Sequence, residues 1–177
     1  DRLRTRYPWI LVSIIVVVLN AGATRGVFHY DDHHSVVRNQ ALSDLSLIPA
    51  FFQDPALFSA DPGRGMYRPV LLTTYAINRA VLGSEPFSFL VGNLLIHAAN
   101  AALVTLIALH WLSSARAMFA GLLFGLHPVI TEPVNYVSAR SDSLVALFLL
   151  LTIVWATHSK LEGGEAGGGL ALRWKRC

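Results

Sequence analysis

Hydrophobic residues along this chain are gathered into long runs, which are separated by stretches rich in polar residues. Four runs predict transmembrane helices, at about residues 9–24, 87–112, 117–127 and 143–158. A helix needs about 20 apolar residues to cross a bilayer, and somewhat fewer when aromatic or basic residues anchor its ends. The pattern therefore predicts an all-α, polytopic membrane region over residues 1–158, with the lipid bilayer as its surroundings.

The first polar connection, residues 25–86, is long and predicts amphipathic helices at the membrane surface. Ser43 is the expected N-cap of a short helix, which Pro49 would interrupt. Its apolar side would be formed by Leu45, Ile48, Phe51 and Phe52.

A second helix is predicted in this connection from Pro69 to Leu82, with Gly83 as its stop. At about 21 Å it is too short to cross a membrane. Arg68 and Arg79 fall on one of its sides, together with Leu72 and Tyr75. The two arginines fit a functional site or, equally, an anchor for lipid phosphates.

Charge predicts the orientation of the chain. Three arginines precede the first run, and the Gly-rich tail 159–177 is basic, so both ends are expected in the cytoplasm. Loops 25–86 and 128–142 then share the extracytoplasmic side. A cleaved signal peptide ending near Ala21–Gly22–Ala23 is the rival interpretation of the first run.

Composition narrows the functional classes. The chain has 177 residues, of which 54% are hydrophobic and 14% charged, and a formal net charge of +3. Its Arg and Lys residues sit at the ends of apolar runs, without a basic stripe interleaved with aromatics, so nucleic acid is not the expected partner. The single cysteine, Cys177, says nothing about the redox compartment.

The run at 87–112 carries a stripe of polar residues, Asn93, His97 and Asn100, at helical spacing. Polar groups are costly in lipid, so the stripe is expected to face protein or water. Hydrogen bonding between helices is the preferred interpretation. The other is a transport path with His97 as a proton relay.

The densest ionisable cluster is "FHYDDHHSVVRN", residues 28–39, which contains Asp31 and Asp32. Adjacent carboxylates suit a general base or the binding of a divalent cation, Mn²⁺ or Mg²⁺. Arg68 and Arg140 would neutralise a phosphate leaving group. The alternatives are a solvated acidic turn and, with His29, His33 and His34, a structural zinc site.

Four motifs in order carry a resemblance to a known family: "YDDHHSVVRN", "MYRPV" with "TTYAINRAVLG", "PFSFLVGNLLIHAANAAL" and "GLLFGLHPVITEPVNYVSARSDSLVALFLLL". Over about residues 9–158 the chain resembles the N-terminal membrane region of the TMTC O-mannosyltransferases. More broadly, it is similar to GT-C glycosyltransferases.

The resemblance implies a polytopic enzyme that moves a sugar from a polyprenyl phosphate to a protein, on the lumenal side. In the eukaryotic family the donor is dolichyl-phosphate mannose and the acceptor a Ser or Thr hydroxyl. A eukaryotic member is expected in the endoplasmic reticulum membrane, and a bacterial one in the inner membrane. Asp31 and Asp32 match the acidic pair that acts as base or binds metal, and Arg68 matches the family's Tyr-Arg-Pro arginine. Four residues match polar positions of the second loop: His127, Glu132, Arg140 and Asp142.

The chain departs from the family pattern because no 34-residue tetratricopeptide repeat follows its membrane region. A fragment of a longer enzyme is the expectation drawn from this, with an inactive relative as the other choice. A non-catalytic membrane scaffold and a transporter subunit are the alternative functions.

Overall fold

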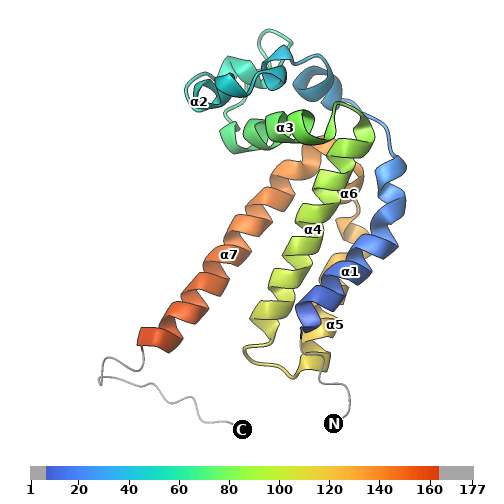
Figure 1. Cartoon of the computed structure of the whole chain (residues 1–177), viewed down its shortest axis with the longest axis vertical. Coiled ribbons are helices and arrows are strands. Elements are labelled where there is room, and N and C mark those ends of the chain that lie inside the picture. Colours follow the sequence, from blue (N-terminus) through green and yellow to red (C-terminus); the bar gives the residue numbers. More distant parts are fainter. Residues whose placement is uncertain (1–6, 164–177) are drawn as a thin grey trace.

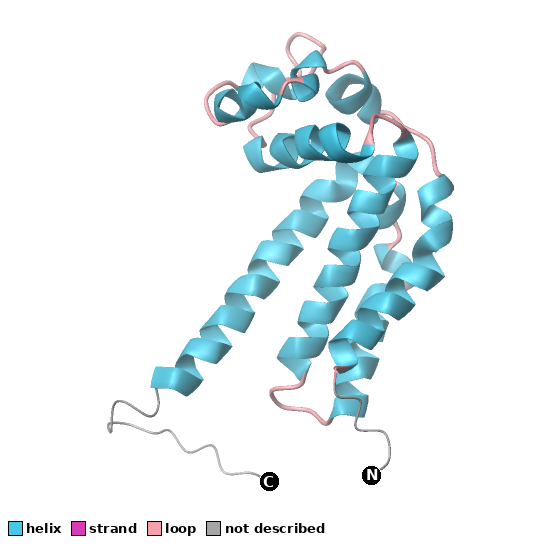
Figure 2. Cartoon of the chain, in the orientation of Figure 1, coloured by secondary structure: helices cyan, strands magenta, loops and turns pink. Residues whose placement is uncertain are grey.

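The structure is a computed structural model that describes residues 7–163, with side chains up to Thr157. Within that range every regular element is helical (Figure 2). Four long helices lie side by side, and shorter ones gather at one end of them (Figure 1). The long helices are α1 (Pro8–Asn20), α4 (Pro86–Ala108), α5 (Ser114–Leu126) and α7 (Arg140–Gly163).

Three of the predicted spans are long and apolar enough to cross a membrane alone: Pro8–Arg25, Pro86–Ala108 and Val137–Thr157. The predicted span 117–127 is not, because α5 has 13 residues. Together with the segment Pro128–Asn135 it forms one apolar stretch bent by 50°. His127, which is extended and precedes Pro128, marks the bend. The protein is therefore a multi-pass membrane protein with three spans, or four if the bent pair crosses as one.

Small residues let the long helices approach closely. A Cβ at Gly121 would meet the Thr105 hydroxyl of α4, and one at Gly125 would meet a Val16 methyl of α1. Val12 and Val16 of α1 form an apolar core with Ala98 and Ala101 of α4. This is the small-residue packing that membrane helices use where burial of apolar surface provides no driving force.

The polar stripe of α4 is used in this packing. The Asn93 amide donates to the carbonyl of Tyr136 at 2.9 Å, and His97 Nε2 lies 3.1 Å from the carbonyl of Gly125. Asn100 donates to the carbonyl of Ser143 at 2.9 Å. All three side chains are buried. The preferred interpretation, hydrogen bonding between helices, is confirmed.

The end that gathers the short helices is called here the cap, residues 21–85. It contains η1 (Ala21–Arg25), the π-helical turn η2 (His33–Val37), η3 (Gln40–Ser43), η4 (Leu45–Leu47), α2 (Ile48–Phe51), η5 (Pro55–Phe58) and α3 (Pro69–Leu82). Helix α3 has the predicted bounds and lies across the tops of α4 and α7 (Figure 1). Its Leu72 and Tyr75 face an apolar core shared with Phe51, Phe58 and Phe89.

Two local expectations in the cap were wrong. Asp44, and not Ser43, caps the turn after it, by accepting the amide of Ser46 at 2.9 Å. Pro49 lies in the first turn of α2 instead of interrupting a helix, because a first-turn residue needs no amide donor. Of the four expected apolar positions, Phe51 is buried, whereas Leu45 and Phe52 are exposed.

The second connection, between α5 and α7, is folded into η6 (Pro128–Ile130), α6 (Glu132–Asn135) and η7 (Val137–Ala139). It lies at the same end of the long helices as the cap (Figure 1). Helix α7 continues to Gly163, beyond the predicted end of the span at 158. The rest of the predicted tail, residues 164–177, lies outside the described residues, as do the three N-terminal arginines.

Candidate functional site

The two connections meet through Asp32. Its Oδ1 accepts hydrogen bonds from the backbone amide and the hydroxyl of Ser138, at 2.9 and 2.5 Å. These residues are 106 positions apart in the chain. The sequence predicts that the acidic motif and the second loop lie on the same side of the membrane region. The direct contact between Asp32 and Ser138 confirms that the two segments lie together.

The adjacent carboxylates have different surroundings. Asp32 is fully buried, and its Oδ2 also accepts the amide of His29 at 3.0 Å. The Asp31 side chain is 63% exposed. Tyr30, just before the pair, has a φ of 37°, in the left-handed region that non-glycine residues seldom adopt. This turn places the two neighbours in different surroundings, so only Asp31 is open to a substrate.

The side chain of His34 is hydrogen-bonded to the carboxylate of Asp31. Its Nε2 lies 3.3 Å from Asp31 Oδ1, and its Nδ1 lies 3.0 Å from the hydroxyl of Ser59. The Ser59 oxygen also accepts the amide of Asp61. Because a carboxylate only accepts hydrogen bonds, the Nε2 of His34 carries a hydrogen and donates it to Asp31. His34 is only 6% exposed.

Loop and helix geometry fixes this arrangement. The π-helical turn after Asp32 brings His34 back beneath Asp31, and Ser35 ties the turn by donating to the carbonyl of Asp31. Asn39 joins the π-helical turn to the segment just before Ser59, since its side-chain amide donates to the carbonyls of Leu57 and Phe58 at 2.9 and 3.2 Å. Neither Ser59 nor Asn39 was among the residues predicted from sequence, because hydrogen bonds across loops leave no periodic signal.

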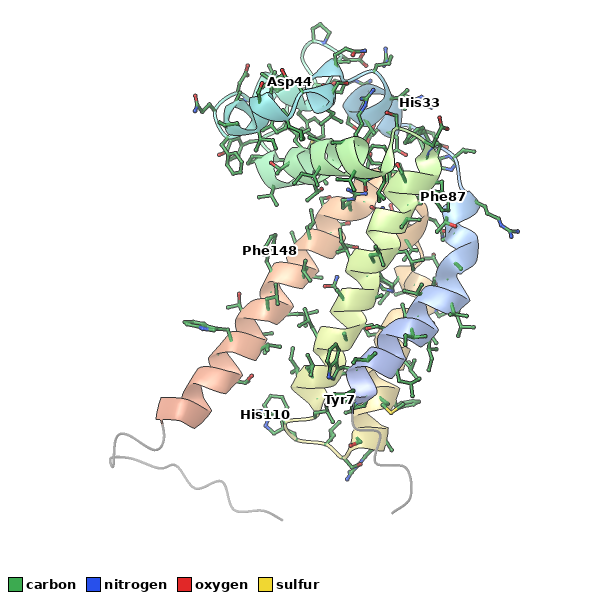
Figure 3. All side chains as sticks on the ribbon, viewed as in Figure 1. Tyr7, His33, Asp44, Phe87, His110 and Phe148 are labelled. Carbon is green, nitrogen blue, oxygen red and sulfur yellow. The ribbon has the colours of Figure 1, made fainter. Side chains whose placement is uncertain are left out.

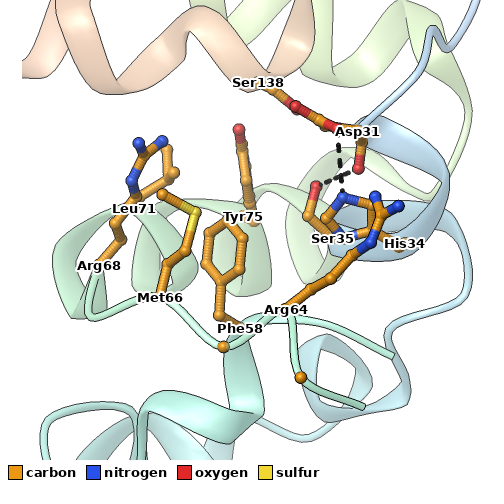
Figure 4. A pocket seen from close by; sticks show the side chains of 12 residues that line it. Asp31, His34, Ser35, Phe58, Arg64, Met66, Arg68, Leu71, Tyr75 and Ser138 are labelled. Atoms are coloured by element: carbon orange, nitrogen blue, oxygen red, sulfur yellow. Dashed lines mark hydrogen bonds and ion pairs between the residues drawn. The ribbon is translucent and has the colours of Figure 1, made fainter. Parts of the chain in front are cut away.

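Asp31 lines a cavity of about 440 Å³, called here the open pocket. Figure 4 shows Asp31 and His34 on one side of it, Arg68 on the other, and Tyr75 between them. Arg64 adds a second guanidinium from a glycine-flanked turn. The remaining lining residues are Ser35, Phe58, Gly63, Gly65, Met66, Leu71 and Ser138.

Tyr75 forms the floor of the open pocket. Burial raises the pKa of its phenol above the ordinary value, so the hydroxyl stays protonated at neutral pH. It donates to the carbonyl of Val137 at 2.8 Å and so ties the floor to the second connection. Its ring packs edge-on against Phe89.

Arg140 lies behind this floor and does not line the pocket. It is 1% exposed, with its guanidinium 4.8 Å from the centre of the Tyr75 ring. It donates to the side-chain oxygens of Asn93 and Asn78, at 2.7 and 3.0 Å, and to the carbonyl of Phe89 at 2.7 Å. Thr74 contributes longer contacts. These residues form the buried cluster, in which Arg140 is enclosed by protein.

The other predicted site residues are not gathered at the pocket. His127 uses Nδ1 to cap its own turn, accepting the amide of Val129 at 3.2 Å. Glu132 lies exposed in the first turn of α6. Asp142 lies exposed in the first turn of α7, beside a neighbouring groove that includes Arg68. Arg79 donates to the carbonyls of Val36 and Asn39, which gives it a role in holding the cap.

The acidic pair does not fit a shared metal ion. Both oxygens of Asp32 accept hydrogen bonds in the interior, which leaves only Asp31 open to solvent. Within residues 7–163 no group of three His, Cys, Asp or Glu side chains is arranged to hold a metal.

Comparison with known proteins finds several curated relatives. The human protein O-mannosyl-transferase TMTC2 is 31% identical over 84% of this chain, which covers 20% of that protein. The human protein O-mannosyl-transferase TMTC4 is 28% identical over 93% of this chain and 25% of that protein. Mouse TMTC2 is also 31% identical, over 78% of this chain. The chain thus spans about a fifth of the length of these relatives.

No family model matches the chain, and no solved structure is similar to it. These relatives are all named as protein O-mannosyl-transferases. The matches cover 78–93% of this chain, the part of the sequence that contains the four ordered motifs and the residues of the open pocket.

Proposed function

The chain belongs to the TMTC family, and from this premise we propose that the protein transfers mannose from a polyprenyl phosphate to a Ser or Thr hydroxyl of a protein. The observation that carries the proposal is the open pocket, in which an exposed carboxylate faces two guanidiniums at the end of a membrane bundle. A sugar phosphate on a lipid needs such a site, close to the ends of the spans.

Asp31 is the proposed general base. It takes the proton of the acceptor hydroxyl, whose oxygen then attacks C1 of the sugar. The bond from C1 to the phosphate oxygen breaks, and the phosphate leaves with that electron pair. A base held in position contributes about 10²–10⁴ to such a step. The negative charge of Asp31 also favours the positive character that develops at C1.

Arg68 and Arg64 are the proposed partners of the departing phosphate. Guanidiniums donate two parallel hydrogen bonds to phosphate oxygens, which makes them suited to a leaving group that gains charge. Arg140, which the sequence also suggested for this role, is enclosed in the buried cluster. We therefore assign it to positioning, since it packs on the face of Tyr75 behind the pocket.

The proposed setting follows from the topology. With the N-terminus in the cytoplasm, the cap and the open pocket face the lumen of the endoplasmic reticulum in a eukaryote, or the periplasm in a bacterium. Transport is the less supported function, because Asn93, His97 and Asn100 are used in helix packing. Polar groups lining a path would have to be free for a solute.

The test is a transfer assay with radiolabelled lipid-linked mannose on the intact protein in membranes. Asp31→Asn is expected to lower transfer by a factor of about 10² or more, because the amide is not a base. Glu85→Gln is the matched control, since Glu85 is exposed at the start of α4 and outside the pocket. Equal transfer by wild type and Asp31→Asn would refute the proposed chemistry.

A further inference from the structure

The segment from Arg64 to Arg68, called here the edge segment, runs along the open pocket without regular secondary structure. Arg64, Met66 and Arg68 line the pocket, and Figure 4 shows their side chains on one side of the segment. Tyr67 reaches the other way, since its hydroxyl donates to the carbonyl of Phe52 at 3.2 Å. Side chains that alternate between two sides are the property of an extended strand.

The backbone of the edge segment has unused hydrogen-bonding groups. Among the described residues, the amides and carbonyls of Gly65 and Tyr67 have no hydrogen-bond partner. The carbonyl of Met66 differs, because it accepts the amide of Arg68 at 3.0 Å in a γ-turn, which is common at strand ends. In an extended chain, residues 65 and 67 present their backbone groups at the same edge. The segment therefore offers two donors and two acceptors along one edge.

The rest of the cap fixes the edge segment in place. Before it, Asp61 forms an ion pair with Arg38 at 3.1 Å, and the amide of Ala60 donates to the carbonyl of His34 at 2.9 Å. After it, Pro69 begins α3. A segment that is already held in its extended form loses little conformational entropy when a second chain pairs with it.

The edge segment is also accessible. Residues 62–67 are all exposed, and they belong to the cap, which lies at the opposite end of the long helices from Tyr7 and His110 (Figure 3). Tyr67 is 62% exposed and Phe52 is 48% exposed, so apolar surface lies beside the edge. An exposed, extended edge with unpaired backbone groups pairs readily with another extended polypeptide.

We propose that an extended segment of the acceptor polypeptide pairs with Gly65 and Tyr67 as an added strand. Main-chain hydrogen bonds hold the acceptor, and every second one of its side chains points into the open pocket. A Ser or Thr at such a position is directed toward Asp31, which lines the same pocket. The acceptor side chains between them contact Tyr67 and Phe52. This inference rests on the proposed function and adds the way in which the acceptor is held.

Charge argues against a second copy of this chain as the occupant. Antiparallel pairing of two edge segments, with Gly65 of each opposite Tyr67 of the other, would be centred on Met66. It would then place Arg64 of each copy opposite Arg68 of the other. Like charges directly opposite each other destabilise a pair of strands. An acceptor segment without cationic side chains meets no such repulsion.

The experiment is a backbone N-methyl scan of a capped, fluorescent peptide of alternating Val and Thr. Its binding to the intact wild-type protein in nanodiscs is measured by fluorescence anisotropy. Successive amides of a strand point to opposite edges, so methylating every second residue blocks one edge and leaves the other free. One set of methyl groups is expected to weaken binding about tenfold or more and the other to change it little. Equal losses from the two sets would overturn the inference.

A pair of variants tests the same edge from the side of the protein. Tyr67→Pro removes a backbone donor of the edge, whereas Tyr67→Ala removes the same side chain and keeps the donor. Binding of the unmethylated peptide is expected to be about three- to tenfold weaker in Tyr67→Pro than in Tyr67→Ala, as when one hydrogen bond is lost. Equal affinities would overturn the inference. The methyl scan uses wild-type protein, so it does not depend on the folding of these variants.

A second copy remains a measurable outcome. Mass photometry of the wild-type protein in nanodiscs of a size that admits two copies is expected to show no dimer that Tyr67→Pro removes. Such a dimer, in a protein that does not bind the peptide, would overturn the inference in favour of pairing between copies.

The transfer assay distinguishes failure of this inference from failure of the proposed function. A peptide with Val in place of Thr is expected to bind with similar affinity and to accept no mannose. Transfer that needs Asp31, with equal effects of the two sets of methyl groups, would refute the added strand alone. Binding that depends on one set, by a protein that transfers no mannose, would refute the transferase and leave the peptide site.

Discussion

The buried cluster around Arg140 and the open pocket around Asp31 are two polar regions that meet at one aromatic ring. The Arg140 guanidinium lies 4.8 Å from the centre of the Tyr75 ring, and Tyr75 also lines the open pocket. Both regions contain arginine and oxygen acceptors, yet one is closed to solvent and the other is open. The difference separates residues that hold the fold from residues available for chemistry.

In the buried cluster every nitrogen of the Arg140 side chain donates a hydrogen bond. The acceptors are neutral, and two aromatic rings, Tyr75 and Phe89, cover the cation. Removing an ion from water costs several kcal/mol, so the cation persists inside only because its donors are satisfied. A group in this state has no capacity left for a ligand.

In the open pocket the charged groups keep free capacity. Among residues 7–163, the Asp31 carboxylate has His34 as its hydrogen-bond partner, and most of the Asp31 side chain is exposed. Arg64 is exposed, and Arg68 has a single long hydrogen bond among the described residues. Incomplete hydrogen bonding, more than residue type, therefore distinguishes the open pocket, where we propose the reaction, from the buried cluster on the other side of Tyr75.

The largest effect on stability is expected from Arg140→Met, which removes the centre of the buried cluster. Asn78, Asn93 and the Phe89 carbonyl would lose a donor in the interior. Breaking one side of such a buried network costs about 3–5 kcal/mol. The free energy of unfolding should fall by that amount, measured by denaturation in mixed detergent micelles.

Arg116→Met is the matched control, because Arg116 is exposed at the start of α5. Its loss should change the free energy of unfolding by about 0.5 kcal/mol or less. If the two variants are equally stable, the buried cluster does not hold the fold together.

The acidic pair allows the same comparison within two adjacent residues. Asp32→Asn puts an amide where three donors converge, from His29 and Ser138, so the free energy of unfolding should fall by about 2–3 kcal/mol. Asp31→Asn should leave the free energy of unfolding within about 0.5 kcal/mol and instead lower transfer by a factor of about 10² or more. The measurement is thermal unfolding of the two variants, compared with their rates in the transfer assay. Destabilisation by Asp31→Asn would contradict the assignment of roles.

Gly92 tests how closely the buried cluster is packed against α4. A Cβ at this position would lie 2.5 Å from Asn78 Oδ1 and 2.7 Å from Arg140 Nη2, inside contact distance. Gly92→Ala should lower the free energy of unfolding by about 1–2 kcal/mol, as overpacking does. Gly22→Ala is the control, because nothing lies within 4 Å of its Cβ position.

Periodic features of this fold were accessible from sequence. Apolar runs fixed the long helices, and the proline at the start and the glycine after the end of α3 gave its bounds, Pro69–Leu82. Charge at the ends of the runs predicted that the two connections share a side, and Asp32 joins them through Ser138. Such features depend on neighbours in the chain, so local rules suffice.

Contacts between distant segments were not accessible. Arg68 and Arg140 both follow a polar loop and precede a helix, but groups of α3 and α4 enclose the Arg140 guanidinium, whereas Arg68 lines the open pocket. His34 and Ser59 are 25 positions apart, joined by a loop whose course no periodicity specifies. The bend of 50° after Leu126, which joins the short helix α5 to the segment Pro128–Asn135, likewise had no signal in the hydrophobic pattern. Tertiary geometry decides these cases.

The smallest expected effect concerns His34, which holds Asp31 but touches no substrate in the proposed reaction. His34→Ala should lower the turnover rate about tenfold, because Asp31 loses the hydrogen bond that orients it. His34→Gln should recover most of that loss, since its amide donates from near the Nε2 position. In an Asp31→Asn background, His34→Ala should add no further decrease, because the two act as one unit. Independent, multiplicative losses would mean that His34 only stabilises the cap, and the open pocket would then owe its reactivity to Asp31 and the arginines alone.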